Sequence, residues 1–506
     1  MLAALLPWLF SAPGSAEAQP LRGLDEFVTR SMAEWQVLGL SLAVVRNDSV
    51  VFLRGFGVRS IATGEPVDEH TVFAIGSAGK AFTTAALAIL TDEGRLDWDD
   101  RVVDRVPDFQ FADPFLNQEA RLRDLVTHRT GLPGGGRANL LFFGSGYDRA
   151  EILRRVRYLT PTVGLRAEFQ YQNLMFLAAG AAVARAAGTS WDAFVEERIF
   201  KPLAMTASST TIRALEGRSN VATPHARVAG AVRTLPWRNI DNIGPAGSIN
   251  STARDMTAWL RFHLGNGSFQ GSRIISEKAA QEIRTPQIVL PPSRMGSMNA
   301  ISRVGAASHF FTYALGWVVF DYRGRRVMWH GGTIDGMAAV VAMMPDERLG
   351  LVVLTNLDGN TLRDAVMLRI FDSYLGAPER DWSRDLFQLA RGGDSRRDQA
   401  PPSPPRAPAR PTRALPDYEG GYQEQLLGGL TIRAAGTKLT FALETGLTGW
   451  LEPIGDDLFR AAWDDPGVAV VLSSLAGAEL RFSFDRPGPA SVADFAGVGR
   501  FERRSP

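Results

Sequence analysis

The segment AIGSAGKAFTTAALAIL, residues 74–90, combines the start of a helix with two chemically reactive side chains. Its apolar residues predict a buried helix over 80–93 that ends at a glycine. Ser77 stands just before this helix and Lys80 follows three residues later, which puts both side chains on one face of the first turn. The chain has only four lysines, at positions 80, 201, 278 and 438. A buried lysine can lose its proton near neutral pH, unlike arginine, so Lys80 is a candidate base.

A serine needs an adjacent base to become a nucleophile, and a neutral lysine can be that base. The apolar neighbours of Lys80 in the sequence would desolvate its ammonium and lower its pKa. The alternative is structural: Ser77 caps the helix and Lys80 extends its amine to solvent. The segment alone does not decide between these two interpretations.

A second group of polar residues, Tyr171-Gln172-Asn173, precedes a strongly apolar helix predicted over 174–187. A phenol at such a boundary can relay protons, and an asparagine can hold a substrate amide. The structural alternative is a helix-entry turn with Asn173 as the cap.

A third group, His330-Gly331-Gly332-Thr333, follows a β-patterned run. Paired glycines let a backbone approach a substrate closely, and the Thr333 N–H together with that of Ser77 would form an oxyanion hole. The alternative is an ordinary glycine-rich hairpin. Two other histidines, His128 and His225, are predicted to be hydrogen-bonded structural residues.

The order of the elements predicts an α+β fold. Two β-rich runs flank the turn residues Arg46-Asn47-Asp48-Ser49, and β patterns return near residues 313–356. Helical patterns occupy the middle of the chain, at 80–93, 120–127, 174–187 and 254–264. Strands at both ends of this region favour one antiparallel sheet flanked by helices, with an all-helical region beside it.

The composition changes after this region. We expect a proline-rich linker over 377–415, followed by a small all-β domain over 416–506 of sandwich or barrel type. The preceding domain would span 20–376. Residues 1–18 resemble a secretory signal that ends in Ala-Glu-Ala, which predicts an exported protein, periplasmic or secreted. The alternatives are a start codon placed slightly late or a disordered apolar tail.

Composition excludes several functions. The net charge of +1 provides no basic field for nucleic acid, and no later apolar run reaches the length of a membrane span. Cysteine is absent, so there are no disulfides, thiolate metal sites or cysteine nucleophile. We expect no metal and no cofactor, and a small-molecule or peptide substrate.

Together the three groups resemble the active-site motifs of the serine β-lactamase and penicillin-binding-protein superfamily, in the class C β-lactamase-like branch of esterases and D-aminopeptidases. Similar stretches include LRDLVTHRTGLPG, IFKPLAMTAS, GPAGSINSTARDMTAWL and VVLTN. The resemblance covers about residues 24–375. The tail is similar to the lipocalin-like domain that some members carry.

The resemblance implies roles for these residues. Ser77 becomes the acylated nucleophile, Lys80 and Tyr171 share general-base and proton-relay work, and Asn173 orients the substrate amide. Which of Lys80 and Tyr171 takes the serine proton stays open. The family's third motif usually starts with lysine, where His330 stands here, and a mostly neutral histidine binds a β-lactam carboxylate less well.

We therefore expect a serine hydrolase that forms an acyl-enzyme and hydrolyses esters or amides, either β-lactam-like compounds or D-amino-acid peptides. One alternative is a D-stereospecific peptidase or carboxypeptidase acting on peptidoglycan-type peptides. Another is a catalytically silent, penicillin-binding-like protein that only binds a ligand.

Overall fold

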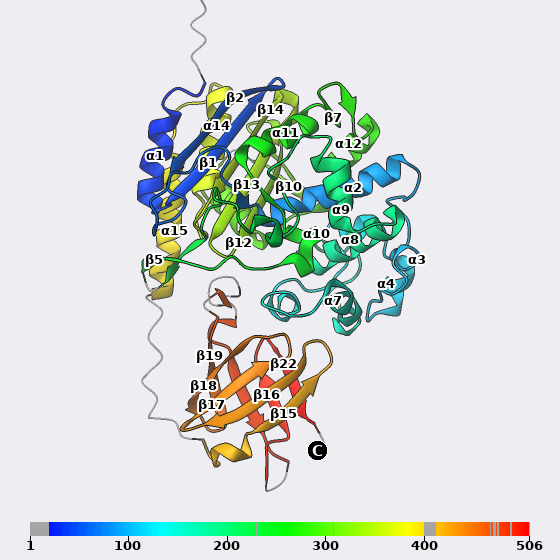
Figure 1. Cartoon of the computed structure of the whole chain (residues 1–506), viewed down its shortest axis with the longest axis vertical. Helices are drawn as coiled ribbons and strands as arrows, with labels where there is room; N and C mark the ends of the chain where they lie inside the picture. Colours follow the sequence, from blue (N-terminus) through cyan, green and yellow to red (C-terminus); the bar gives the residue numbers. More distant parts are fainter. Residues whose placement is uncertain are drawn as a thin grey trace, which may run out of the picture.

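The computed structural model describes residues 20–398 and 411–504, apart from residues 229, 307, 466, 469–471, 473, 474, 486 and 487. A large α+β domain is followed by a small β-barrel (Figure 1). The predicted signal over 1–18 and the proline-rich centre of the predicted linker lie outside the described residues. No helix in the described part of the chain has the length and apolar character that a membrane span requires.

The large domain is built on one antiparallel sheet, as predicted. In spatial order its strands are β2 (Ser49–Gly57), β1 (Gly39–Arg46), β14 (Leu349–Thr355), β13 (Met337–Met344), β12 (Arg325–Ile334), β11 (Val318–Tyr322), β10 (Phe311–Tyr313) and β9 (Ile288–Val289). The first long strand of the chain, β1, therefore pairs with the last strand of this domain, β14, and β2 pairs with β1 at the edge of the sheet.

Both faces of the sheet are buried, which explains why its central strands read as continuous apolar runs. In β13, Val341 and Met343 belong to one hydrophobic core while Val340 and Ala342 belong to another. The alternation follows from the two-residue period of a strand. The sheet thus separates two cores, and the residues of β12 that share the face of Met328 point toward the helical region.

The hairpin between β1 and β2 confirms the predicted turn. Asn47 and Asp48 both have positive φ angles, 49° and 65°. Two such residues make the two-residue turn whose twist matches paired strands, and Asn and Asp tolerate this conformation well. The hairpin aligns the N-terminal strands along one edge of the sheet.

The helices cover both faces. On one face lie α1 (Leu24–Trp35), α14 (Leu362–Tyr374) and α15 (Trp382–Asp398) (Figure 1). The other side of the sheet carries the helical region, formed by α2 (Lys80–Asp92), α3 (Val102–Arg105), α4 (Pro114–Glu119), α5 (Leu122–Leu125), α6 (Gly136–Asn139), α7 (Arg149–Arg155), α8 (Asn173–Ala187), α9 (Trp191–Val195), α10 (Gly244–Gly247), α11 (Ala253–Leu264) and α12 (Glu277–Arg284). Helix α13 (Gly296–Arg303) packs into the core that contains Val340 and Ala342, on the same face of the sheet as α1.

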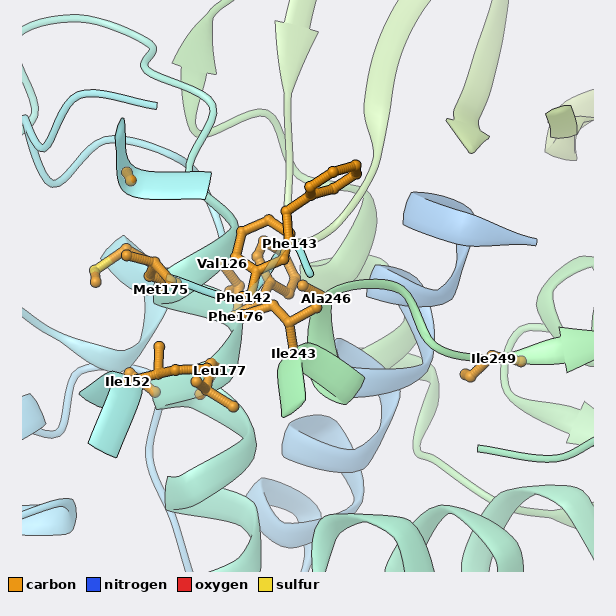
Figure 2. Packing of buried hydrophobic residues seen from close by; sticks show 14 of the residues in the cluster. Val126, Phe142, Phe143, Ile152, Met175, Phe176, Leu177, Ile243, Ala246 and Ile249 are labelled. Carbon is orange, nitrogen blue, oxygen red and sulfur yellow. The ribbon is translucent and has the colours of Figure 1, made fainter. Parts of the chain in front are cut away.

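The predicted helices over 80–93, 174–187 and 254–264 agree with α2, α8 and α11 to within one residue at each end. The pattern at 120–127 forms only the short α5. Aromatic and aliphatic side chains of α8, α10 and the loop after α6 pack together in the helical region, as Figure 2 shows for Phe142, Phe176 and Ala246.

The predicted linker over 377–415 is wrong in its first half. Helix α15 occupies Trp382–Asp398 and docks on the large domain. Trp382 and Leu386 are each 1% exposed, and the Trp382 indole donates a hydrogen bond to Asp372 Oδ2 at 2.7 Å. These apolar residues lie one helical turn apart, so they share a face that burial stabilises.

The C-terminal domain is a closed antiparallel barrel. The sequence predicted an all-β domain of either sandwich or barrel type, and the structure shows the barrel. Its strands are β15 (Gly420–Glu424), β16 (Gly428–Ala435), β17 (Lys438–Leu443), β18 (Thr448–Gly455), β19 (Leu458–Trp463), β20 (Glu479–Ser483), β21 (Val492–Phe495) and β22 (Gly499–Arg503). The barrel contacts the large domain: Arg155 Nη1 donates to Leu426 O at 3.0 Å, and the Tyr147 hydroxyl donates to Leu427 O at 2.9 Å.

Candidate active site

The predicted nucleophile and base lie side by side. Ser77 sits in a short 3₁₀ turn, Gly76–Gly79, which leads directly into α2 at Lys80. Lys80 Nζ is 3.0 Å from Ser77 Oγ. The lysine is 0% exposed, and burial lowers its pKa well below the usual 10.5. The amine is therefore poised to be neutral next to the serine hydroxyl.

Two further oxygens hold the lysine amine in place. Asn173 Oδ1 accepts from Nζ at 2.7 Å, and the Ala246 carbonyl oxygen accepts at 2.8 Å. Asn173 is free for this contact because Gln172, not Asn173, caps α8 by accepting from the Leu174 amide. The structure thus brings the first two predicted groups together.

Tyr171 completes this cluster. Its ring centroid lies 4.8 Å from Lys80 Nζ. A hydrogen bond with the Ser77 side chain favours the phenolate, but burial is the larger effect and raises the pKa of Tyr171 well above 10.0. The phenol therefore keeps its proton at neutral pH. His128 stacks on Tyr171 and accepts a hydrogen bond from the Gln172 amide at 3.0 Å, in the structural role predicted for it.

The third predicted group lies on β12, against the turn that carries Ser77. A Cβ atom on Gly332 would lie 1.8 Å from Ile75 O and 3.1 Å from Ser77 N. A Cβ atom on Gly76 would lie 2.9 Å from Thr333 N. The amides of Ser77 and Thr333 thus belong to two backbone segments in direct contact, which is the arrangement that an oxyanion hole requires.

This contact predicts the effect of one small substitution. Gly332→Ala should lower kcat by about 100-fold, because the new methyl group must push β12 away from the Ser77 turn and misplace the backbone amides. The matched control is Gly146→Ala, where a Cβ would meet nothing within 4 Å. Steady-state ester hydrolysis by the two purified variants measures the difference. Equal rates would contradict the close contact.

His330 lies on the same face but is not a cation. Its Nδ1–H donates to the Gly331 carbonyl oxygen at 2.7 Å, so Nε2 accepts from the Tyr313 hydroxyl at 3.0 Å. Burial and then the charges of Lys80 and Arg363 lower the pKa of His330 to about 3. Both ring nitrogens are used by the protein, and the ring is neutral at physiological pH. His225 is buried and bonded to the Asn356 carbonyl, as predicted.

Arg363, on α14, is a site residue that the sequence interpretation missed. Its Nη1 donates to Gly332 O at 2.7 Å and to Thr333 Oγ1 at 3.3 Å. It is 7% exposed and lines the same cavity as Ser77. The VVLTN stretch ends seven residues before Arg363. The position of Arg363 at the start of the helix that follows this stretch was the only signal in the sequence that could have pointed to it.

The candidate residues surround an open cavity of about 630 Å³. It is lined by Ser77, Tyr171, Asn173, His330, Gly331, Gly332, Thr333, Arg294 and Arg363, among others. Within the described ranges, no group of three or more metal-ligating side chains is placed to hold a metal ion. The arrangement is suited to nucleophilic catalysis by a serine.

Comparison with known proteins agrees with this geometry. The family model described as Beta-lactamase matches residues 24–373. The chain belongs to the beta-lactamase family. This beta-lactamase-family chain is a serine hydrolase, and its large domain has the class C-like fold of the superfamily.

Individual relatives extend the comparison. The unguisins hydrolase ungD of Aspergillus violaceofuscus is 25% identical over 97% of this chain and 89% of its own length. The crystal structure of SurE with D-Leu is 21% identical, covers 96% of this chain and all of its own, and has a TM-score of 0.55. A class C beta-lactamase is 17% identical over 73% of this chain and 99% of its own, with a TM-score of 0.57.

Proposed function

We propose that this hydrolase forms an acyl-enzyme on Ser77 and hydrolyses ester or amide substrates. The observation that carries the proposal is the set of contacts around the Lys80 amine. A neutral amine has two N–H groups and one lone pair. The carbonyl oxygens of Asn173 and Ala246 accept the two N–H groups, which directs the lone pair to the Ser77 hydroxyl at 3.0 Å.

In the proposed mechanism, Lys80 takes the Ser77 proton as Oγ attacks the substrate carbonyl. The amides of Ser77 and Thr333 stabilise the developing oxyanion. Tyr171 passes its proton to the leaving group and regains one from the Lys80 ammonium, which makes the amine neutral again. A water molecule then gives a proton to Lys80 and attacks the ester carbonyl, and Lys80 returns that proton to Ser77 Oγ as the acyl product leaves. Of the two candidate bases we favour Lys80, because its pKa is lowered and that of Tyr171 is raised, so the lysine is the group that loses its proton more readily.

For the substrate, we propose a peptide-like amide or ester that contains a D-amino acid rather than a β-lactam. The neutral His330 supplies no charge for the carboxylate of a β-lactam. The names of the relatives, an unguisins hydrolase and SurE with D-Leu, support this class. We also propose export, on the signal-like residues 1–18.

A D-stereospecific carboxypeptidase is the second candidate, because two arginines, Arg294 and Arg363, line the open cavity. Such cations suit the terminal carboxylate of a peptide leaving group. A catalytically silent binding protein is disfavoured, because Ser77, Lys80 and Tyr171 form one connected cluster. Parallel assays with p-nitrophenyl esters, D-amino-acid amides, D-Ala-D-Ala peptides and nitrocefin separate these candidates. Turnover of none of them would contradict the proposal.

The pKa directions predict a pH profile. Only neutral Lys80 can accept a proton, so kcat/KM should fall as the pH falls through the lowered pKa of Lys80, at a midpoint well below 10.5. Tyr171→Phe should retain this acidic limb at a lower overall rate. His330→Gln should also retain it, because His330 is already neutral above about pH 3. Loss of the limb in Tyr171→Phe would instead identify the tyrosine as the titrating base.

A further inference from the structure

A second, smaller cavity opens beside Ser77. Its volume is about 90 Å³, and it shares Ser77, Asn173 and Thr333 with the larger cavity. Most of its wall is apolar, formed by Phe142, Phe143, Ile240, Ile243, Ala246 and Ile334. Figure 2 shows Phe142, Ile243 and Ala246 crowded together at this wall. Since a cavity of about 150 Å³ accommodates benzene, this one suits a smaller aliphatic group.

Besides Ser77, Asn173 and Thr333, two further polar side chains line this cavity. They are Asp335, directly after β12, and Asn139, the last residue of α6. Asp335 is 4% exposed. Its Oδ1 atom and Asn139 Oδ1 are both buried, and neither has a hydrogen-bond partner among the described residues. Two unpaired acceptors at one small cavity call for a ligand that donates hydrogen bonds.

The charges around Asp335 do not cancel. Arg238 donates through Nε to Asp335 Oδ2 and through Nη1 and Nη2 to both oxygens of Asp465, at 2.7 and 2.9 Å. One guanidinium thus serves two carboxylates, and the cluster carries one excess negative charge when both are ionised. Burial raises the pKa of Asp335, which Arg238 opposes. A bound cation would offset this cost of burying the carboxylate.

We propose that the small cavity binds the free ammonium group of the substrate's acyl residue, together with a small aliphatic side chain. An ammonium offers three N–H donors, and Asp335 Oδ1 and Asn139 Oδ1 accept two of them. The inference rests on the proposed acylation of Ser77, because the acyl carbonyl must reach that hydroxyl. It makes the enzyme an aminopeptidase-type hydrolase, which disfavours N-acylated substrates.

The barrel contributes to this site. Asp465 lies in the barrel after β19, and a Cβ atom on the nearby Gly467 would lie 2.3 Å from Arg238 Nη2 and 2.7 Å from Asp335 Oδ2. A Cβ atom on Gly144 would lie 2.9 Å from Leu447, at the turn before β18. The barrel therefore supports both the acidic end of the cavity and the loop that carries Phe142 and Phe143.

The test compares the p-nitroanilide of leucine, as each enantiomer, with the p-nitroanilide of 4-methylpentanoic acid, which lacks only the amine. The wild-type enzyme should hydrolyse one leucine enantiomer with a higher kcat/KM than the 4-methylpentanoic compound, and this ratio is the amine preference. Asp335→Asn should reduce this preference by about 30-fold or more, because it removes a buried charge partner of the ammonium. Asn139→Ala should reduce it less and leaves the Arg238 pairs intact. The control, Asp346→Asn, removes an exposed partner of Arg326 and should leave the preference unchanged.

A second measurement covers poor turnover of anilides. D- or L-leucinamide should slow fluorophosphonate labelling of Ser77 in wild type more than 4-methylpentanamide does, and Asp335→Asn should abolish the difference. If Ser77 is labelled but the amine gives no preference in either measurement, the ammonium site is overturned while the proposed function stands. If Ser77 is never labelled, the proposed function fails, and the ammonium site fails with it.

Discussion

Replacing Ser77 with alanine is expected to lower kcat for ester hydrolysis by about 10⁴-fold or more, the scale seen when a serine nucleophile is removed. The variant lacks only one oxygen atom at a half-buried position, so the fold should be retained. Lys80 keeps its bonds to Asn173 and Ala246. Steady-state release of p-nitrophenol measures the loss, with the thermal unfolding midpoint as the check on folding.

The residual activity of Ser77→Ala is itself informative. Backbone amides at the oxyanion site remain in this variant, so some rate above the water reaction is expected. A folded Ser77→Ala enzyme with more than about a tenth of wild-type activity would rule out Ser77 as the nucleophile.

Replacing Lys80 with arginine is the second large effect. Arginine keeps the positive charge but cannot lose its proton, so it cannot accept the Ser77 proton. Loss of a general base costs about 10²- to 10⁴-fold in rate. Lys80 is fully buried, so the larger and permanently charged side chain should also lower the thermal unfolding midpoint.

Two further variants separate catalysis from stability at this position. Lys80→Met keeps an apolar stem of similar length without a charge. This variant should therefore fold but have no activity. Lys201→Arg is the matched control, because Lys201 is a surface lysine paired with Glu197, and its activity should equal that of wild type. Substantial turnover by folded Lys80→Arg would make Lys80 structural and leave Tyr171 as the base.

Much of the sheet and its covering helices could be predicted because the signals are local. The Asn47-Asp48 turn, the apolar period of α2 and the glycine after α8 each depend on a few neighbouring residues. The linker prediction failed where local composition competes with packing. Proline enrichment is strong after residue 400, but the face formed by Trp382 and Leu386 extends a helix into the expected linker.

The site was predictable where its residues occur as ordered motifs, but not where function depends on distant packing. Ser77 and Lys80 are three residues apart, so their contact follows from helix geometry. Arg363 carries no motif and reaches the site only because α14 packs there. Asp335 stands two residues after Thr333, but its environment depends on Arg238 and the barrel, which are distant in the sequence. The neutral form of His330 depends on its burial in the folded domain, where its Nε2 atom accepts a hydrogen bond from Tyr313 on another strand.

The pairing of Arg238 with Asp465 is the most remote of these contacts, because the two residues are 227 positions apart. No composition or spacing argument connects a loop of the large domain with a turn of the barrel. The fold thus brings a residue of the C-terminal domain close to the candidate active site. The sequence alone had suggested no role for that domain.

The most direct test of the account is the identification of the acylated residue. The full-length protein is treated with a fluorophosphonate between about pH 6 and pH 10, and its mass and the modified peptide are determined by mass spectrometry. We expect one adduct per chain, on the peptide that contains Ser77, formed faster as the pH rises, slowed strongly in Lys80→Arg and absent in Ser77→Ala. An adduct on a different serine, or no adduct at any pH at which the protein stays folded, would contradict the account.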